Sequence, residues 1–106
     1  MTPAQFVGLF AKEKRDMLRS YVGNADTAVG AQIKAMDLSP KELKALRAVL
    51  DGVLTDAFYT VLLALDGAAS LGGKQVTYFL RDEDGKELTG GEIEACAWER
   101  FHGTDE

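Results

Sequence analysis

The 106-residue sequence has few of the residues that build metal sites and covalent cross-links: one cysteine, Cys96, and one histidine, His102. A single cysteine excludes an internal disulfide and is typical of a protein in a reducing compartment. Because zinc sites normally draw on several cysteines and histidines, no zinc site is expected. On one helix the two side chains would point about 240° apart, so they would form no catalytic dyad. We expect neither a metal nor a cofactor.

Long hydrophobic runs are also missing. The longest apolar run extends from Ala57 to Leu65, whereas a membrane-spanning helix needs about 20 apolar residues. The first residues, MTPAQFVGLFAKEK, have neither the basic start nor the small-residue cleavage site of a secretory signal. We therefore expect a cytoplasmic protein that does not enter a membrane.

Positive charge is in short supply, with 12 Lys and Arg against 17 Asp and Glu and a net charge of −5. The most basic stretch, KEKR at residues 12–15, is interrupted by Glu13 and followed by Asp16. Because a phosphate backbone favours a positive protein surface, nucleic-acid binding is not expected. The acidic balance suits a partner protein with a basic surface, although many acidic proteins are merely soluble.

Apolar periodicity predicts one domain over residues 1–106 with a largely helical N-terminal half. Thr2 with Gln5 and Ser39 with Glu42 form two capping boxes, each with proline at the first helical position. Helices are predicted from the first box, around residues 29–36, and from the second box to about Asp66.

A β-hairpin is predicted over residues 74–89, KQVTYFLRDEDGKELT, because apolar and polar residues alternate before a DEDGK turn. Thr89, three residues before Glu92, is the expected cap of a last helix. The fold class predicted from the sequence is therefore α+β, with a long central helix, a β-hairpin and a closing helix.

Asp66 lies where the central helix meets the small-residue loop GAASLGGK. A phosphate loop is rejected, because Gly73 interrupts the motif and the order of strand and helix is reversed. A carboxylate at a helix C-terminus is unfavourable beside the dipole, so Asp66 needs a positive or donor partner. Our hypothesis is that Arg100 pairs with Asp66 or Asp56, and the alternative is that Arg100 simply extends to solvent.

The stretch RDEDGKE at residues 81–87 is rich in carboxylates but lacks the spacing of a calcium-binding loop. No pattern predicts a cleft with a catalytic carboxylate, so we do not expect an enzyme. The remaining enzyme hypothesis uses Asp66 or Asp56 together with Tyr59.

Residues 50–102 resemble a widespread group of small, acidic bacterial proteins of the toxin-immunity kind. The resemblance is carried by DAFYTVLLALDG, GG.QVTYFL.DEDG and EIEACAWERFH. It implies a cytosolic protein that binds and blocks one toxin domain, and the first half of the chain has no part in it.

Composition and resemblance together favour a binding protein that neutralises a cognate toxin by occluding it. Exposed acids and aromatic residues are the expected contacts. The candidate partner-binding residues are Tyr78, Phe79, Asp82, Glu83, Asp84, Glu87 and Trp98. The alternative is a homo-oligomeric structural or regulatory module, a homodimer for example, in which the apolar second half of the central helix lies between subunits.

Overall fold

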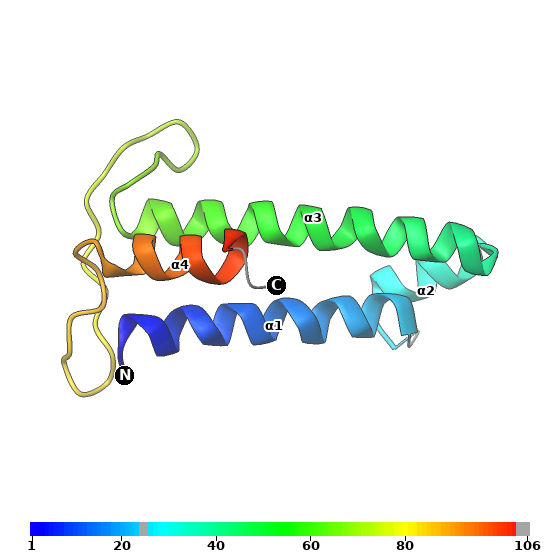
Figure 1. Ribbon diagram of the computed structural model, residues 1–106, viewed down its shortest axis with the longest axis horizontal. Coiled ribbons are helices and arrows are strands. Elements are labelled where there is room, and N and C mark those ends of the chain that lie inside the picture. Colours follow the sequence, from blue (N-terminus) through cyan, green and yellow to red (C-terminus); the bar gives the residue numbers. More distant parts are fainter. Residues whose placement is uncertain (24–25, 104–106) are drawn as a thin grey trace. The chain divides into compact units, whose positions relative to one another are not determined.

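The structure is a computed structural model that describes residues 1–23 and 26–103. Within these ranges the chain forms four helices, shown in Figure 1. They are α1 (Pro3–Gly23), α2 (Ala28–Ala35), α3 (Pro40–Leu65) and α4 (Glu92–His102). The contacts divide the chain into unit 1, which is Met1–Ala11 with Asp56–Glu106, and unit 2, which is Lys12–Thr55.

The predicted α+β class is wrong, because the described residues contain helices and no β-strand. Where the hairpin was expected, the backbone forms one isolated bridge, between Arg81 and Glu87. The pairing of the two backbone segments ends there because a side chain, not the opposite backbone, accepts the next amide hydrogen bond. The hydroxyl of Thr89 accepts the amide of Leu80 at 3.1 Å. An isolated two-stranded hairpin is marginal in water, and alternation alone does not supply the partner strand that would extend it.

Both predicted capping boxes are confirmed. The Gln5 amide donates to Thr2 Oγ1 at 3.0 Å, and the Thr2 amide donates to Gln5 Oε1 at 2.8 Å. Ser39 and Glu42 exchange the same pair of bonds at 2.9 and 3.1 Å. Each box satisfies two amides that the helix itself leaves without a partner, and so fixes where α1 and α3 begin.

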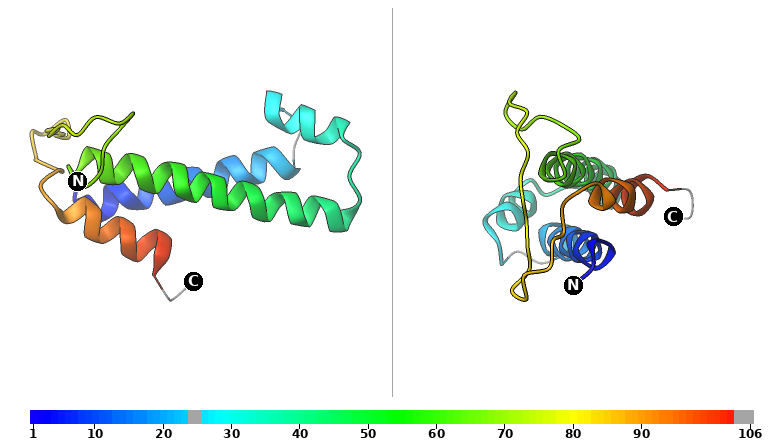
Figure 2. Two further views of the ribbon diagram at one scale, coloured as in Figure 1. Left: turned by 90° about the horizontal axis from the view of Figure 1, so that it is seen from above. Right: turned by 90° about the vertical axis from the view of Figure 1, so that its left-hand side faces the viewer.

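The core of unit 1 is built where α4 lies beside the first turns of α1 and the last turns of α3 (Figures 1 and 2). Its buried side chains are Val7, Leu62, Leu88, Ile93 and Ala97. They come from all three helices and from the segment that precedes α4. Burial of apolar side chains from each element is what holds α4 in place, since each contributes about 1.5–3 kcal/mol when fully covered.

Asp66 caps α4 by accepting hydrogen bonds from amides that lie 24 to 28 residues further along the chain. Its Oδ1 accepts the amides of Gly90 at 2.7 Å and Gly91 at 2.9 Å, and its Oδ2 accepts the amide of Glu94 at 2.8 Å. Gly91 is the residue at the cap position, and it has no side chain to do this itself. The prediction that Thr89 caps this helix is therefore wrong, because its hydroxyl accepts the hydrogen bond of the Leu80 amide instead.

The expected donor partner of Asp66 is thus a set of backbone amides. A carboxylate at the C-terminus of α3 opposes the dipole of its own helix but complements the N-terminus of α4. Arg100 is exposed, and the residues that the structure describes contain no ion pair between Arg100 and either Asp66 or Asp56.

Unit 2 is held by a partly buried ion pair between α1 and α3. Lys14 Nζ lies 3.1 Å from Asp51 Oδ1 and donates to Thr55 Oγ1 at 3.0 Å, with its side chain 17% exposed. Leu18, one turn further along α1, is buried. In α2 the Gly30 amide donates to the capping hydroxyl of Thr27.

We predict that Asp66→Ala lowers the free energy of unfolding by about 1–2 kcal/mol, because it removes the cap of α4. Urea denaturation followed by circular dichroism measures this change. The matched control is Asp56→Ala, since Asp56 is an exposed aspartate of α3, and its effect should stay within about 0.5 kcal/mol. Equal losses in the two variants would contradict the assigned role of Asp66.

Candidate protein-binding surface

The 26 residues between Leu65 and Glu92 form one long segment without helix or strand, which we call the connecting loop (residues 66–91). Figure 2 shows it crossing the end of the helices of unit 1. Ordered connections longer than about 12–15 residues without secondary structure are uncommon, and they usually serve binding or catalysis. The connecting loop is therefore a candidate functional segment.

Its first half is fixed by hydrogen bonds close to the end of α3. The Ala68 amide donates to the Leu63 carbonyl at 2.8 Å, and Gln75 Nε2 donates to the Gly67 carbonyl at 2.7 Å. Leu71 and Lys74 close a tight turn on each other, with Gly72 and Gly73 between them at φ values of 61° and 82°. The paired glycines thus serve a left-handed turn, which agrees with the rejection of a phosphate loop.

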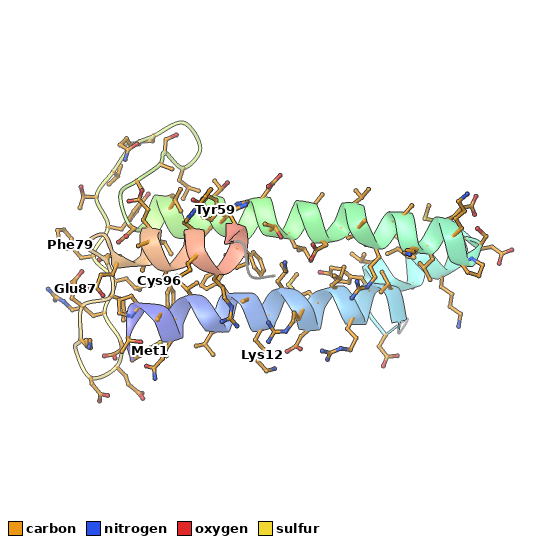
Figure 3. All side chains as sticks on the ribbon, in the orientation of Figure 1. Met1, Lys12, Tyr59, Phe79, Glu87 and Cys96 are labelled. Atoms are coloured by element: carbon orange, nitrogen blue, oxygen red, sulfur yellow. The ribbon has the colours of Figure 1, made fainter. Side chains whose placement is uncertain are left out.

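Three large apolar side chains of the connecting loop face solvent. Phe79 is 76% exposed, Leu71 46% and Val76 36%. In Figure 3, Phe79 lies at the end of the unit where the loop runs. A well-fixed loop that keeps apolar groups in water is typical of an interaction site, and aromatic side chains carry much of the free energy of protein interfaces.

A cavity of about 280 Å³ adjoins Phe79. Its walls include Asp66, Thr77, Tyr78, Glu87 and Thr89. Both predicted aromatic contacts line this cavity, but Tyr78 is half-buried whereas Phe79 is largely exposed. The cavity is large enough for one side chain of a partner.

The four acidic residues of the connecting loop that were predicted to contact a partner divide into two that shape the loop and two that are available. Asp82 accepts the N-terminal ammonium at 2.9 Å and the amides of Asp84 and Lys86 at 2.9 Å each. The Glu87 carboxylate accepts a hydrogen bond from Arg81 Nε at 3.2 Å and another from the Thr89 hydroxyl.

The carboxylates of Glu83 and Asp84 are the two that are available. Both residues are exposed, and neither carboxylate has an ion-pair partner among the described residues. Of the four acids predicted to contact a partner, these two are therefore free to do so.

Trp98 lies in a separate aromatic cluster between α3 and α4. Its ring centroid is 6.5 Å from that of Tyr59 and 5.3 Å from that of His102, and the Tyr59 and His102 rings are 4.5 Å apart in an edge-to-face arrangement. Trp98 is 58% exposed. Sequence reasoning missed His102 in this cluster, although its spacing of four residues from Trp98 places both on one side of α4.

Cys96 lines a smaller cavity of about 230 Å³ with Ala4, Val7, Glu99 and Arg100. Burial, helped by nearby carboxylates, raises the pKa of its thiol. The thiolate is the reactive form, so this environment disfavours a nucleophilic role for Cys96.

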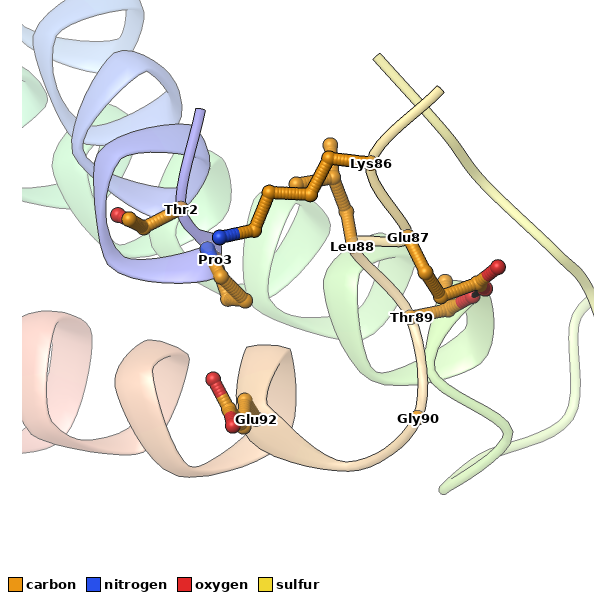
Figure 4. A pocket seen from close by; sticks show the side chains of 8 residues that line it. All are labelled: Thr2, Pro3, Lys86, Glu87, Leu88, Thr89, Gly90 and Glu92. Atoms are coloured by element: carbon orange, nitrogen blue, oxygen red, sulfur yellow. Dashed lines mark hydrogen bonds between the residues drawn. The ribbon is translucent and has the colours of Figure 1, made fainter. Parts of the chain in front are cut away.

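Another cavity, of about 250 Å³, lies between the start of α1 and residues 86–92 (Figure 4). In that view the Lys86 side chain extends toward Thr2 and Pro3, and Glu92 lies on the opposite wall. In residues 1–23 and 26–103, no group of three His, Cys, Asp or Glu side chains is placed to hold a metal ion.

Comparison of the chain with protein-family models, with curated proteins and with solved structures finds no match. The resemblance to toxin-immunity proteins therefore stays a prediction.

Helix α3 is long and apolar enough to cross a membrane, judged by length and composition alone. An 18-residue stretch of it has a mean hydropathy of 1.6, and 11% of that stretch is buried. The sequence prediction considered only uninterrupted apolar runs, whereas this stretch remains apolar although it includes charged residues. A single helix of this kind is weak evidence, so this property establishes neither a membrane nor a cytoplasmic location.

We predict that Asp82 titrates far below an ordinary aspartate. The hydrogen bond from the N-terminal ammonium, followed by that from the Lys86 amide, lowers its pKa from 3.8 to about 2. Because the pKa falls on folding, the stabilisation by this carboxylate is present above pH 4 and is lost as pH falls from about 4 to about 2. NMR titration of the side-chain carboxyl measures the pKa directly, with the urea-unfolded chain as the control. A native midpoint near 3.8 would show that the turn does not depend on this charge.

Proposed function

We propose that the chain is a protein-binding module that neutralises its partner by covering it with the connecting loop. The observation that carries this proposal is the exposure of Phe79, at 76%, on a loop whose backbone is fixed by hydrogen bonds. Because hydrogen bonds fix the neighbouring backbone, the loop has less conformational entropy to lose on association, so burial of Phe79 contributes more fully to affinity.

The exposed charges of the connecting loop support a partner with a basic surface. Glu83 and Asp84 are exposed carboxylates on the same loop. Complementary charge speeds encounter and discriminates against other acidic proteins. The resemblance of residues 50–102 supports a cognate bacterial toxin, met in the cytoplasm, as this partner.

Co-expression with the product of the neighbouring gene is the first test, and the expected results are that toxicity disappears and the two proteins copurify. Phe79→Ala should then weaken the purified complex about 30-fold, or ~2 kcal/mol, as measured by calorimetry.

Two valines provide a matched control for the surface. Val76→Ala, on the connecting loop, should weaken the complex, whereas Val29→Ala, at an exposed position of α2, should leave affinity unchanged. An undiminished complex with Phe79→Ala would reject the connecting loop as the binding surface.

A second candidate function is self-association through α3. Val49 and Val53 lie one turn apart and are 59% and 54% exposed. Two apolar side chains in line on a helix that is mostly unburied favour a helix–helix contact with a second copy.

We predict for this second candidate that sedimentation at rising concentration shows a dimer. Val53→Glu should abolish it, whereas Met36→Glu, at an exposed apolar position of α2, should not. A chain that stays monomeric over the same concentration range would reject self-association.

A further inference from the structure

The net charge of −5 conceals a separation of charge between the two units. Unit 2, residues 12–55, contains eight Lys and Arg against six Asp and Glu, whereas unit 1 contains four against eleven. The net charges are +2 and −7. The averaged charge on which nucleic-acid binding was not expected therefore does not describe unit 2.

Half of the basic side chains of unit 2 line one cavity of about 540 Å³. They are Lys14, Arg15, Arg19 and Arg47, which we call the cationic cleft. The other walls are Leu18, Ala48 and Asp51. The buried Leu18 and the exposed Ala48 add apolar groups to this charged wall. Small-molecule sites commonly combine apolar lining with a few charged groups.

The carboxylates near the cationic cleft are already committed to lysines. Asp51 pairs with Lys14 at 3.1 Å, and Asp16 pairs with Lys12 at 2.7 Å. The hydrogen bond from Lys12 lowers the pKa of Asp16, as expected of a charged pair.

Arg19 has only a longer contact, at 3.4 Å, to the second oxygen of Asp16. For Arg15 and Arg47, no carboxylate of the described residues lies within ion-pair distance of the guanidinium. Three guanidinium groups therefore surround the cavity with little compensating negative charge.

We propose that the cationic cleft binds a phosphate group, carried by a small organic ligand that contacts Leu18 and Ala48. A guanidinium presents two parallel N–H donors that match the oxygens of a phosphate. Phosphate is favoured over a carboxylate because it concentrates more negative charge in one small group. The cavity wall presents two guanidinium groups, Arg15 and Arg47, without an ion-pair partner among the described residues, beside the weakly paired Arg19. The volume suits a small molecule, within the range of about 300–1,000 Å³ typical of such sites.

The test uses the full chain and pyrophosphate as the probe, with binding followed by calorimetry and by NMR shifts of the Leu18 and Ala48 amides. Arg47→Gln should weaken binding by about tenfold or more, as expected for loss of a charge-assisted hydrogen bond. The control is Lys44→Gln, which removes the same charge one turn away on α3 but outside the cavity wall. Circular dichroism checks that both variants keep their helices.

Vesicles of phosphatidylglycerol distinguish the source of the phosphate. Binding of pyrophosphate that is sensitive to Arg47→Gln supports a soluble ligand, and vesicle binding with the same sensitivity supports a lipid headgroup. Absence of both, or equal losses with Arg47→Gln and Lys44→Gln, would overturn the proposal, because the attraction would then be diffuse.

Discussion

The carboxylate of Asp66 joins the end of α3 to the beginning of α4 through three backbone amides. These bonds also bring the two ends of the connecting loop together, since Asp66 begins the loop and Gly90 and Gly91 end it. Closing a flexible loop of this length costs entropy that a few bonds at its base must offset. The exposure of Phe79, the cavity beside it and the seating of α4 all depend on this closure.

The sequence predicted correctly those features whose interacting residues lie close together in the chain, and failed for those whose partners lie far apart. Capping boxes such as Thr2 with Gln5 lie within four residues, so the sequence predicted them correctly. The hairpin prediction was wrong because alternation between residues 76 and 81 reports which side chains are half-buried, not whether a partner strand exists. The need of Asp66 for a donor was predicted, but its amides lie 24–28 residues away, beyond the reach of a local pattern.

The candidate surface shows the same limit. Phe79, Glu83 and Asp84 were predicted from residue type, and the structure leaves all three exposed. Asp82 and Glu87 were predicted on the same grounds, but they accept hydrogen bonds that shape the turn. The cationic cleft was missed altogether, because its cations come from two segments, Lys14–Arg19 of α1 and Arg47 of α3. Each segment, taken alone, is diluted by acids.

The connecting loop and α4 share one source of stability, so binding and folding are thermodynamically coupled. A partner that buries Phe79 holds the loop in the conformation in which Asp66 reaches the α4 amides, and it therefore stabilises α4 without touching it. The coupling also works in reverse, because any opening of the cap frees the loop and reduces the fraction of molecules ready to bind. The cationic cleft is built only from residues of unit 2, so its affinity for phosphate does not draw on this linkage. We therefore expect α4 to become more stable when a partner binds the connecting loop, but not when a ligand binds the cationic cleft.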